Sequence, residues 1–251
     1  MIKFFRKLRW SSLSRKRIPK YLLYATGEIL LVVIGILIAL QVNDWNENLK
    51  NDNKEQLILK DLHLEFQKNK EKLQSVIQHH QEIVDATTQV LNLVGQPEAA
   101  ILQHNIDSLL YITIDHYDFS PNESAISELI SSGKLNLITS DNLRLLIFEW
   151  VSAVEEKTEG YETMDEMSQT LTLPYITKNG SMKDIDQFGI VKIGHSKFEA
   201  VNYKLFKERE FENHMDNQVW GVTNYLLKLK RLEIIINDIV RFTNTETPTQ
   251  K

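Results

Sequence analysis

Near the start of the chain, charged residues give way to an almost unbroken apolar stretch, Tyr21–Leu40, in which Glu28 is the only charged residue. As an α-helix, about twenty residues span about 30 Å, which is the thickness of the hydrocarbon core of a bilayer. Aromatic rings flank the stretch, with Trp45 just beyond its end, and such rings prefer the boundary between lipid and water. The pattern predicts a transmembrane helix over residues 21–42.

Two other interpretations of this stretch are a cleaved signal peptide and a buried helix of a soluble domain. A signal peptide shares the basic start, but the exit, Ile38–Val42, has no small-x-small cleavage pattern. A soluble core helix is disfavoured because residues 1–20 carry eight basic residues and no acidic one. We therefore expect an uncleaved membrane anchor.

Charge is distributed unevenly on the two sides of the apolar stretch. Residues 44–251 hold 21 basic and 33 acidic residues, a net charge of −12. Basic flanks of membrane helices stay in the cytoplasm, so residues 1–20 should form a basic cytoplasmic segment at the inner membrane, with the rest of the chain outside it. We expect no nucleic-acid partner, because the basic patch would be held against the lipid bilayer.

Glu28 lies roughly 12 Å inside the predicted span, where a carboxylate costs up to roughly 2 to 3 kcal/mol. Its side chain either reaches back to the cytoplasmic headgroups or contacts a second helix. Gly35 follows seven positions later and Ala39 four after that, so the three residues share one stripe and include a small-xxx-small pair. Glu28, Gly35 and Ala39 are therefore candidate contact residues for self-association or for pairing with another span.

In two long segments of the outer region, apolar residues recur every three or four positions. The first segment ends near Val94, before Gly95, and the last covers residues 203–242. The predicted seams are Leu59, Leu62, Phe66, Asn69, Leu73, Val76, His80, Ile83, Thr87, Val90 and Val94, and then Met215, Val219, Val222, Leu226, Leu229, Glu233, Ile236 and Val240. This spacing predicts an antiparallel pair of coiled-coil-like helices, whose polar seam residues set the register.

Shorter helices are predicted between the two long ones. One covers residues 98–112 and another residues 122–132, the latter after a capping box with proline at Ser120–Glu123. Residues 134–138 follow as an extended link.

A further helix is predicted to begin at Ser140 or Asp141 and to end at Pro174. Residues 175–202 are expected to be a long loop or a small hairpin, with a short strand at Phe188–Ile193.

The predicted fold class is therefore mainly α, because these helices leave no sheet of consequence. We expect an N-terminal transmembrane helix followed by an extracytoplasmic helical bundle with long coiled-coil-like helices. Residues 43–243 would form the bundle, and residues 244–251 a flexible polar tail.

The sequence contains no catalytic or cofactor-binding motif that we recognise. It has no cysteine, no phosphate-binding glycine loop and no nucleophile elbow. The Asp115–Asp118 string is interpreted as a solvated turn, with a proton-transfer pair as the alternative. An acidic run over residues 155–166 is either a solvated helix face or a docking surface. The histidines lack the spacing of a closed metal site; they are His63, His79, His80, His104, His116, His195 and His214. We expect no enzymatic activity, no cofactor and no metal.

Two stretches carry a family resemblance. Residues 20–47 contain GEILLVVIGILIALQVNDWNE, and residues 128–138, with Asn142–Arg144 after them, form a second signature. Both resemble a large bacterial family of uncharacterised single-span inner-membrane proteins. The resemblance implies an inner-membrane protein with an outward, periplasmic helical domain, and it carries over no catalytic residue.

Three functions are compatible with these features. The one we favour is a membrane-anchored helical interaction or scaffold protein of the cell envelope, with the lipid bilayer and a protein partner or second copy as its contacts, through the transmembrane helix and the heptad seams. The second is an extracytoplasmic sensor that signals through a membrane partner. The third is an envelope enzyme built on residues 115–118 and 175–202.

Overall fold

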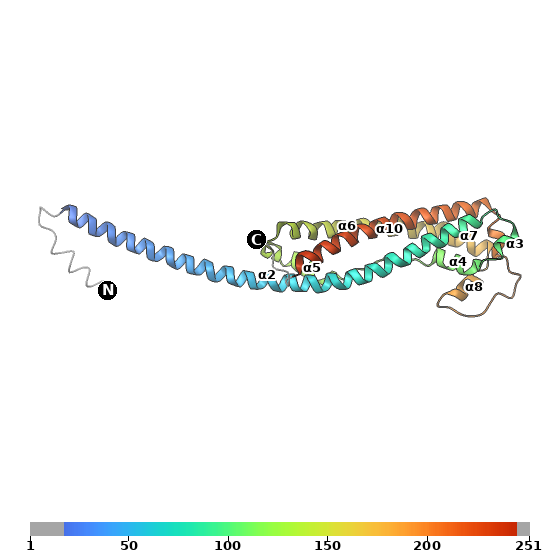
Figure 1. Ribbon diagram of the computed structural model, residues 1–251, viewed down its shortest axis with the longest axis horizontal. Helices are drawn as coiled ribbons and strands as arrows, with labels where there is room; N and C mark the ends of the chain where they lie inside the picture. The colour runs from blue at the N-terminus through green and yellow to red at the C-terminus, as the bar shows by residue number, and fades with distance from the viewer. Residues whose placement is uncertain (1–17, 245–251) are drawn as a thin grey trace. The chain divides into compact units, whose positions relative to one another are not determined.

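The computed structural model describes residues 18–244, and within them every regular element is a helix (Figure 1). The mainly α fold class is therefore confirmed. The predicted basic segment lies outside the described residues except for its last three positions, and so does the predicted tail except for Asn244. The helices are α2 (Ile18–Leu93), α3 (Glu98–Ile101), α4 (Ile106–Ile114), α5 (Ser124–Ser131), η1 (Lys134–Leu137), α6 (Asp141–Met167), η2 (Ser168–Thr172), α7 (Leu173–Asn179), α8 (Met182–Ile185), η3 (Asp186–Phe188), α9 (Asn202–Leu205) and α10 (Arg209–Thr243).

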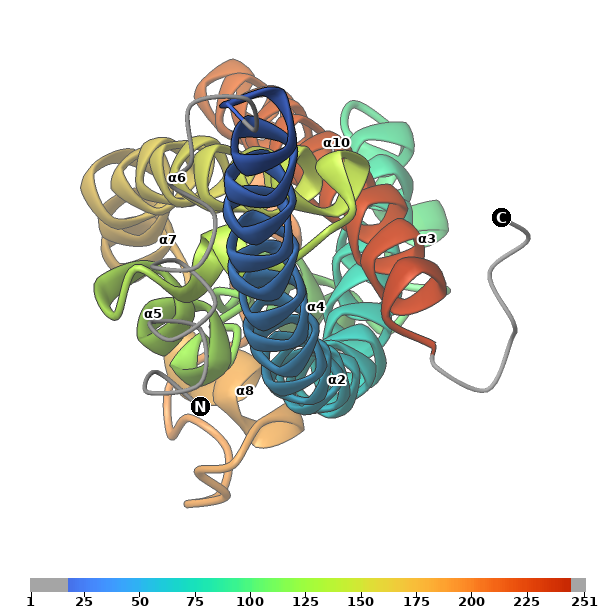
Figure 2. The ribbon, with the colours of Figure 1, turned by 90° about the vertical axis from the view of Figure 1, so that its left-hand side faces the viewer.

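The chain divides into two compact units, residues 1–55 and residues 56–251. The described part of the first unit is the N-terminal part of α2. The second unit is a helical bundle in which α6 lies along α10, as both views show (Figures 1 and 2). The remainder of α2 packs on this pair through a core that includes Phe66 and Trp150, whose rings meet edge to face with centroids 5.0 Å apart.

The predicted seam of α2 is confirmed over most of its length. Its residues from Leu62 to Val90 are buried in the bundle, and only the two end positions, Leu59 and Val94, are partly exposed. Gly95, with a φ of 76°, ends the helix as expected, and its N–H donates to the carbonyl oxygen of Phe206 at 2.8 Å.

The predicted seam of α10 is confirmed at five of its eight positions, which are Met215, Val222, Leu226, Leu229 and Ile236. The buried face of the helix is wider than a single line of residues, and its buried residues are Phe211, Met215, Gln218, Gly221, Val222, Tyr225, Leu226, Leu229, Leu232, Ile235, Ile236, Ile239 and Thr243. Glu233 was predicted in the seam, but Leu232 takes that place and Glu233 is only half-buried beside it. The predicted line therefore lies within the buried face, but it missed buried positions such as Gln218, Tyr225 and Leu232.

The N-terminus of α5 is capped by a side chain from another helix and not by the predicted capping box. No side chain of its own segment caps α5. Glu65 of α2 takes this role, because its Oε2 accepts from the hydroxyl of Ser124 at 2.6 Å and from the N–H of Ala125 at 2.9 Å. A carboxylate at a helix N-terminus also interacts favourably with the helix dipole.

Three further predictions between the long helices are wrong in detail. The helix expected over residues 98–112 is two helices, because Asn105 caps α4 by accepting from the N–H of Ser108 at 3.2 Å. The link at residues 134–138 is mostly a 3-10 turn and not extended. Residues 188–193 form no strand, since the backbone makes no ladder there.

Pro174 does not end the helix that was predicted to begin at Ser140 or Asp141. Ser140 caps α6 as expected, but the helical path continues through the π-turn η2 into α7, with Pro174 in the first turn of α7. A proline lacks an N–H and crowds the carbonyl four residues earlier, and the wider π-turn relieves both problems. The expected loop at residues 175–202 therefore begins with a buried helix, in which Ile176 is fully enclosed.

Candidate functional site

The apolar part of α2 is exposed on all sides. It has the length and hydropathy of one membrane-spanning helix, with a mean hydropathy of 2.4 over its most apolar window, and none of that window is buried. Leu23 and Leu31, for example, are 78% and 74% exposed. A helix that is hydrophobic all round is suited to an apolar environment and not to water.

The three candidate contact residues, Glu28, Gly35 and Ala39, all lie on this part of α2 and are all exposed. Their spacing places them on one stripe of the helix. A Cβ atom added at Gly35 would meet nothing within 4 Å, so the described residues leave space there for a second helix. The contact itself stays a prediction, because it needs a helix from another chain.

The Asp115–Asp118 string is not the solvated turn that the sequence suggested. The His116 side chain is only 3% exposed, and its Nε2 lies 3.1 Å from the Oδ1 of Asp165 on α6. Phe119, directly after the string, is fully buried in the core. Because Phe119 is buried, the polar residues just before it lie between the helices. The sequence of residues 115–118 alone did not predict this position.

Asp118, Lys157 and Tyr225 form the centre of a buried polar cluster that also includes His80 and His116. The Nζ of Lys157, which is 2% exposed, donates to both carboxylate oxygens of Asp118 at 2.8 and 2.9 Å. The hydroxyl of Tyr225 donates to the Oδ1 of Asp118 at 2.7 Å. The cluster thus ties α6, α10 and the segment after α4 together.

Burial shifts the pKa values of two side chains in this cluster, His80 and Tyr225. It lowers the pKa of His80 to about 4, so the ring is neutral at pH 7. Burial, with the hydrogen bond to Asp118, also raises the pKa of Tyr225. The Nε2 of His80 and the Nδ1 of His116 are buried without a hydrogen-bond partner. Asp118, Lys157 and Tyr225 are committed to one another, which favours a structural role over proton transfer to a substrate.

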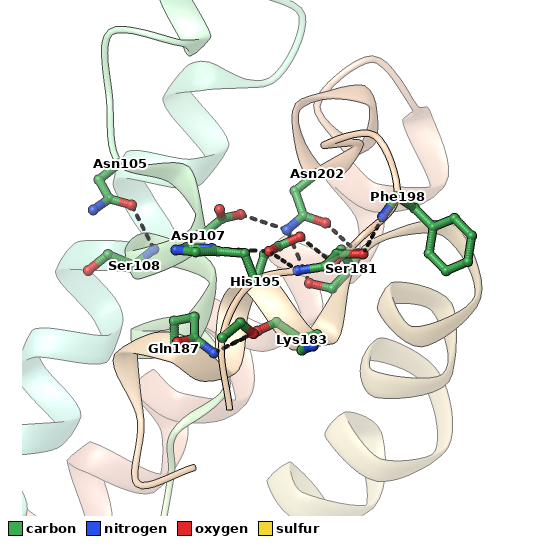
Figure 3. A network of polar contacts seen from close by, with 12 residues as sticks. Asn105, Asp107, Ser108, Ser181, Lys183, Gln187, His195, Phe198 and Asn202 are labelled. Atoms are coloured by element: carbon green, nitrogen blue, oxygen red, sulfur yellow. Dashed lines mark hydrogen bonds and ion pairs between the residues drawn. The ribbon is translucent and has the colours of Figure 1, made fainter. Parts of the chain in front are cut away.

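A second polar network holds the end of the bundle where α8 and α9 meet α4 (Figure 3). Asp184 accepts from the hydroxyl of Ser181 at 2.5 Å and from the N–H of Ser196 at 2.9 Å, and the Nδ1 of His195 lies 3.2 Å from its Oδ1. The hydrogen bond from Ser181 is the main cause that lowers the pKa of Asp184.

The Asp184 network resembles a catalytic triad in composition but not in order. In a triad the histidine lies between the serine and the acid, so that it can take the proton of the hydroxyl. Here Asp184 lies between Ser181 and His195, and the serine hydroxyl is committed to the carboxylate. The arrangement fixes the loop that follows α8 and does not activate a nucleophile. Among residues 18–244, no three His, Asp or Glu side chains gather as a metal site would require.

The acidic run of α6 is divided by its contacts. Glu156 pairs with Arg231 of α10 at 2.5 Å, and Asp165 pairs with His116. The run therefore does not act as one continuous acidic surface.

Sequence reasoning missed one surface of α10. Trp220, Leu227 and Ile234 follow each other at intervals of seven and are 55%, 62% and 65% exposed. We call these three residues the outer stripe. They fall outside both the predicted seam and the buried face of α10, and their heptad spacing is the signal in the sequence that could have identified them.

Comparison with known proteins places the chain in a family. None of the curated proteins and none of the solved structures matches the chain significantly. The model of a family of unknown function, DUF6090, matches residues 28–155, which is more than half of the 251 residues. The matched region begins at Glu28, includes Gly35 and Ala39, and continues into α6. The protein therefore belongs to the DUF6090 family of unknown function.

Proposed function

We propose that the protein is a single-pass, membrane-anchored helical interaction protein of the bacterial cell envelope, without catalytic activity. One observation carries the proposal: the apolar part of α2 is long enough to cross a bilayer and exposes its side chains all round. The eight basic residues of segment 1–20 favour a cytoplasmic N-terminus and a periplasmic bundle.

The form of the bundle supports an interaction role. Its densest polar groups are engaged in holding helices and loops together, as Asp118 and Asp184 show. The heptad seams of α2 and α10 are buried inside the bundle, so they are occupied within the chain itself. A partner of the bundle would therefore contact exposed positions, of which the outer stripe at Trp220, Leu227 and Ile234 has the spacing of a helix–helix contact.

The test of the anchor is a topology experiment on the full chain. Spheroplasts of cells that express the protein with a C-terminal epitope are treated with protease and then separated into membrane and soluble fractions. We expect the protein in the membrane fraction after a carbonate wash, with its epitope removed by protease only from the outside. Protection of the epitope in intact spheroplasts, or a soluble product that starts near residue 41, contradicts the proposal.

The test of the interaction uses a photo-crosslinking residue at a single position. At Leu227, which is 62% exposed on the outer stripe, we expect one adduct of defined mass. At Glu162, an exposed position on α6, we expect none. Equal labelling at both positions, or no adduct at Leu227 in membranes where the protein is intact, argues against a partner on the outer stripe.

A sensor that signals through a membrane partner is the second candidate. The continuity of α2 from the apolar part into the bundle favours it, since one uninterrupted helix can transmit a displacement or rotation. Replacing only residues 187–198 with a short glycine–serine linker tests this role, because Ile176 and Ile185 before it belong to the core and have to stay. A sensor with its ligand site there should then lose its response while the anchor and the bundle remain.

A further inference from the structure

The segment between η3 and α9 exposes large apolar side chains to an unusual degree. Ile190 is 98% exposed, Phe198 87%, Ile193 68% and Val191 55%. Lys192 and Lys197 stand among them, and residues 187–198 contain no acidic residue, although acids outnumber bases in the chain beyond the apolar stretch. We call residues 187–198 the apolar–basic loop.

The two ends of this loop are held by specific contacts. Asp184 accepts from the N–H of Ser196 at 2.9 Å, and the Nε2 of Gln187 donates to the carbonyl oxygen of Gly194 at 2.9 Å. Gly194 has a φ of 85°, a conformation that other residues rarely adopt. The contacts at its two ends therefore hold the apolar tip of the loop, residues 190–193, in an exposed position, although apolar side chains favour burial.

The loop also fits closely against α4 at one point. A Cβ atom at Gly189 would lie 2.5 Å from the Cε2 of Tyr111, so only glycine allows this approach. The fit positions the start of the tip on the ring of Tyr111 and leaves Ile190, the next residue, free of the bundle.

We propose that the apolar–basic loop docks on the surface of an anionic phospholipid bilayer. Ile190, Val191 and Ile193 would enter the boundary between headgroups and acyl chains, and Lys192 and Lys197 would pair with lipid phosphates. Lysine suits this position, because its alkyl stem lies along apolar surface while its ammonium group stays among the headgroups.

The chemistry of the loop favours a lipid surface over a protein partner. The loop forms no strand that could extend a neighbouring sheet, and its apolar residues project outward rather than line a groove. The mixture of apolar side chains and uncompensated lysines is complementary to the surface of an anionic bilayer. Because residues 190–195 lack helical hydrogen bonds, insertion is shallow, at the level where water still reaches the backbone.

The test has to measure lipid contact by the loop alone, because segment 1–20 is itself strongly basic and attracts anionic lipids. The chain has no cysteine, so Ile190→Cys carries a single polarity-sensitive dye at a fully exposed position. The full chain is reconstituted in neutral phosphatidylcholine nanodiscs and mixed with separate vesicles. The matched control is Leu145→Cys, which puts the same dye at an apolar position on α6 that is 67% exposed and lies outside the outer stripe.

We expect the dye at position 190 to shift to the blue with vesicles of equal parts phosphatidylcholine and phosphatidylglycerol, and the dye at position 145 to remain unchanged. Lys192→Gln with Lys197→Gln should weaken vesicle binding by the labelled loop about 25-fold, because each basic residue near an anionic surface contributes about fivefold. Quenching by nitroxides near the headgroups should exceed quenching by nitroxides deep in the acyl chains.

Three results would overturn the proposal. These are no shift at position 190 with anionic vesicles, an equal shift with purely neutral vesicles, and a shift that grows with protein concentration in the absence of vesicles, which indicates a second copy as the occupant. A chain that fails to enter nanodiscs contradicts the anchor and not the loop, and the dye experiment can then be run on the soluble chain.

Discussion

At the scale of single residues, polar groups inside the bundle set its register. The side chain of Asn69 donates to the carbonyl oxygen of Asn122 and accepts from the N–H of the same residue, both at 2.7 Å. This pairing fixes the segment before α5 on α2 at one position, because a shift by one helical turn would leave a buried amide unpaired. His80 differs, since its Nε2 is buried without a partner and cannot accept a proton without cost.

We expect His80 to make the bundle unstable in mild acid. Its pKa is about 4 in the folded chain and 6.5 for an unperturbed histidine, so the unfolded chain binds the extra proton first as the pH falls. Stability is therefore unaffected above pH 6.5 and falls as the pH drops from 6.5 to 4, by about 3 kcal/mol in total. Urea unfolding of the detergent-solubilised chain at pH 7 and pH 4.5 measures this change.

The control for this prediction is His80→Leu, which stays neutral at every pH. Its stability should depend less on pH between 6.5 and 4 than that of the unaltered chain. An identical pH dependence in the two proteins would show that other groups cause the acid sensitivity. Asp184 affects stability in a separate pH range. Because its pKa is lowered in the folded chain, the stability that it contributes is lost only as the pH falls below 3.8, the ordinary pKa of an aspartate.

At the scale of elements, the position of the α10 seam decides which of its faces is free. The buried face of α10 is more than one line wide, because Tyr225 and Leu226 are both buried, and so are Ile235 and Ile236. Leu232 belongs to this face, and Glu233 is half-buried at its edge. Trp220, Leu227 and Ile234 then face away from the core, which is why the outer stripe is exposed.

A pair of neighbouring alanine substitutions tests this position of the seam. Leu232→Ala should lower the free energy of unfolding by about 2 to 5 kcal/mol, because it leaves a cavity in the core. Glu233→Ala should change it by no more than about 0.5 kcal/mol, as for most surface positions. Thermal and chemical unfolding of the two variants give the comparison, and a larger loss at Glu233 would restore the seam that was predicted from the sequence.

At the scale of the whole molecule, the chain combines a helical segment that is long and apolar enough to cross a membrane with a bundle that has its own core. The N-terminal part of α2 exposes its apolar residues, whereas residues 56–244 enclose theirs around Phe66 and Trp150. The bundle core therefore does not depend on the apolar segment for burial. The stripe at Glu28, Gly35 and Ala39 is left available for contacts between chains.

We expect association between spans to depend on this stripe. Gly35→Leu should lower the signal of a membrane two-hybrid assay several-fold, because the larger side chain keeps two helix backbones apart. Gly27→Leu is the matched control: Gly27 is equally open, with nothing within 4 Å of an added Cβ, but it lies off the stripe. Equal effects of the two substitutions would mean that the stripe has no special part in association.

Much of the architecture could be predicted from the sequence because it depends on local periodicity and on the residues that begin or end helices. The apolar stretch, the seam of α2, the cap at Ser140 and the end at Gly95 each follow from residues close together in the chain. Other features depend on residues far apart. Glu65 caps α5 from α2, and the burial of Phe119 brings Asp118 to Lys157 and Tyr225.

The sequence by itself determined that the chain is helical, with one segment apolar enough for a bilayer and two long helices carrying heptads. Only the tertiary structure decided how wide the buried face of α10 is, and which polar residues lie in buried clusters rather than in solvated turns. The physical reason is that periodicity is a property of neighbouring residues. Burial depends on the surfaces that other elements bring to them.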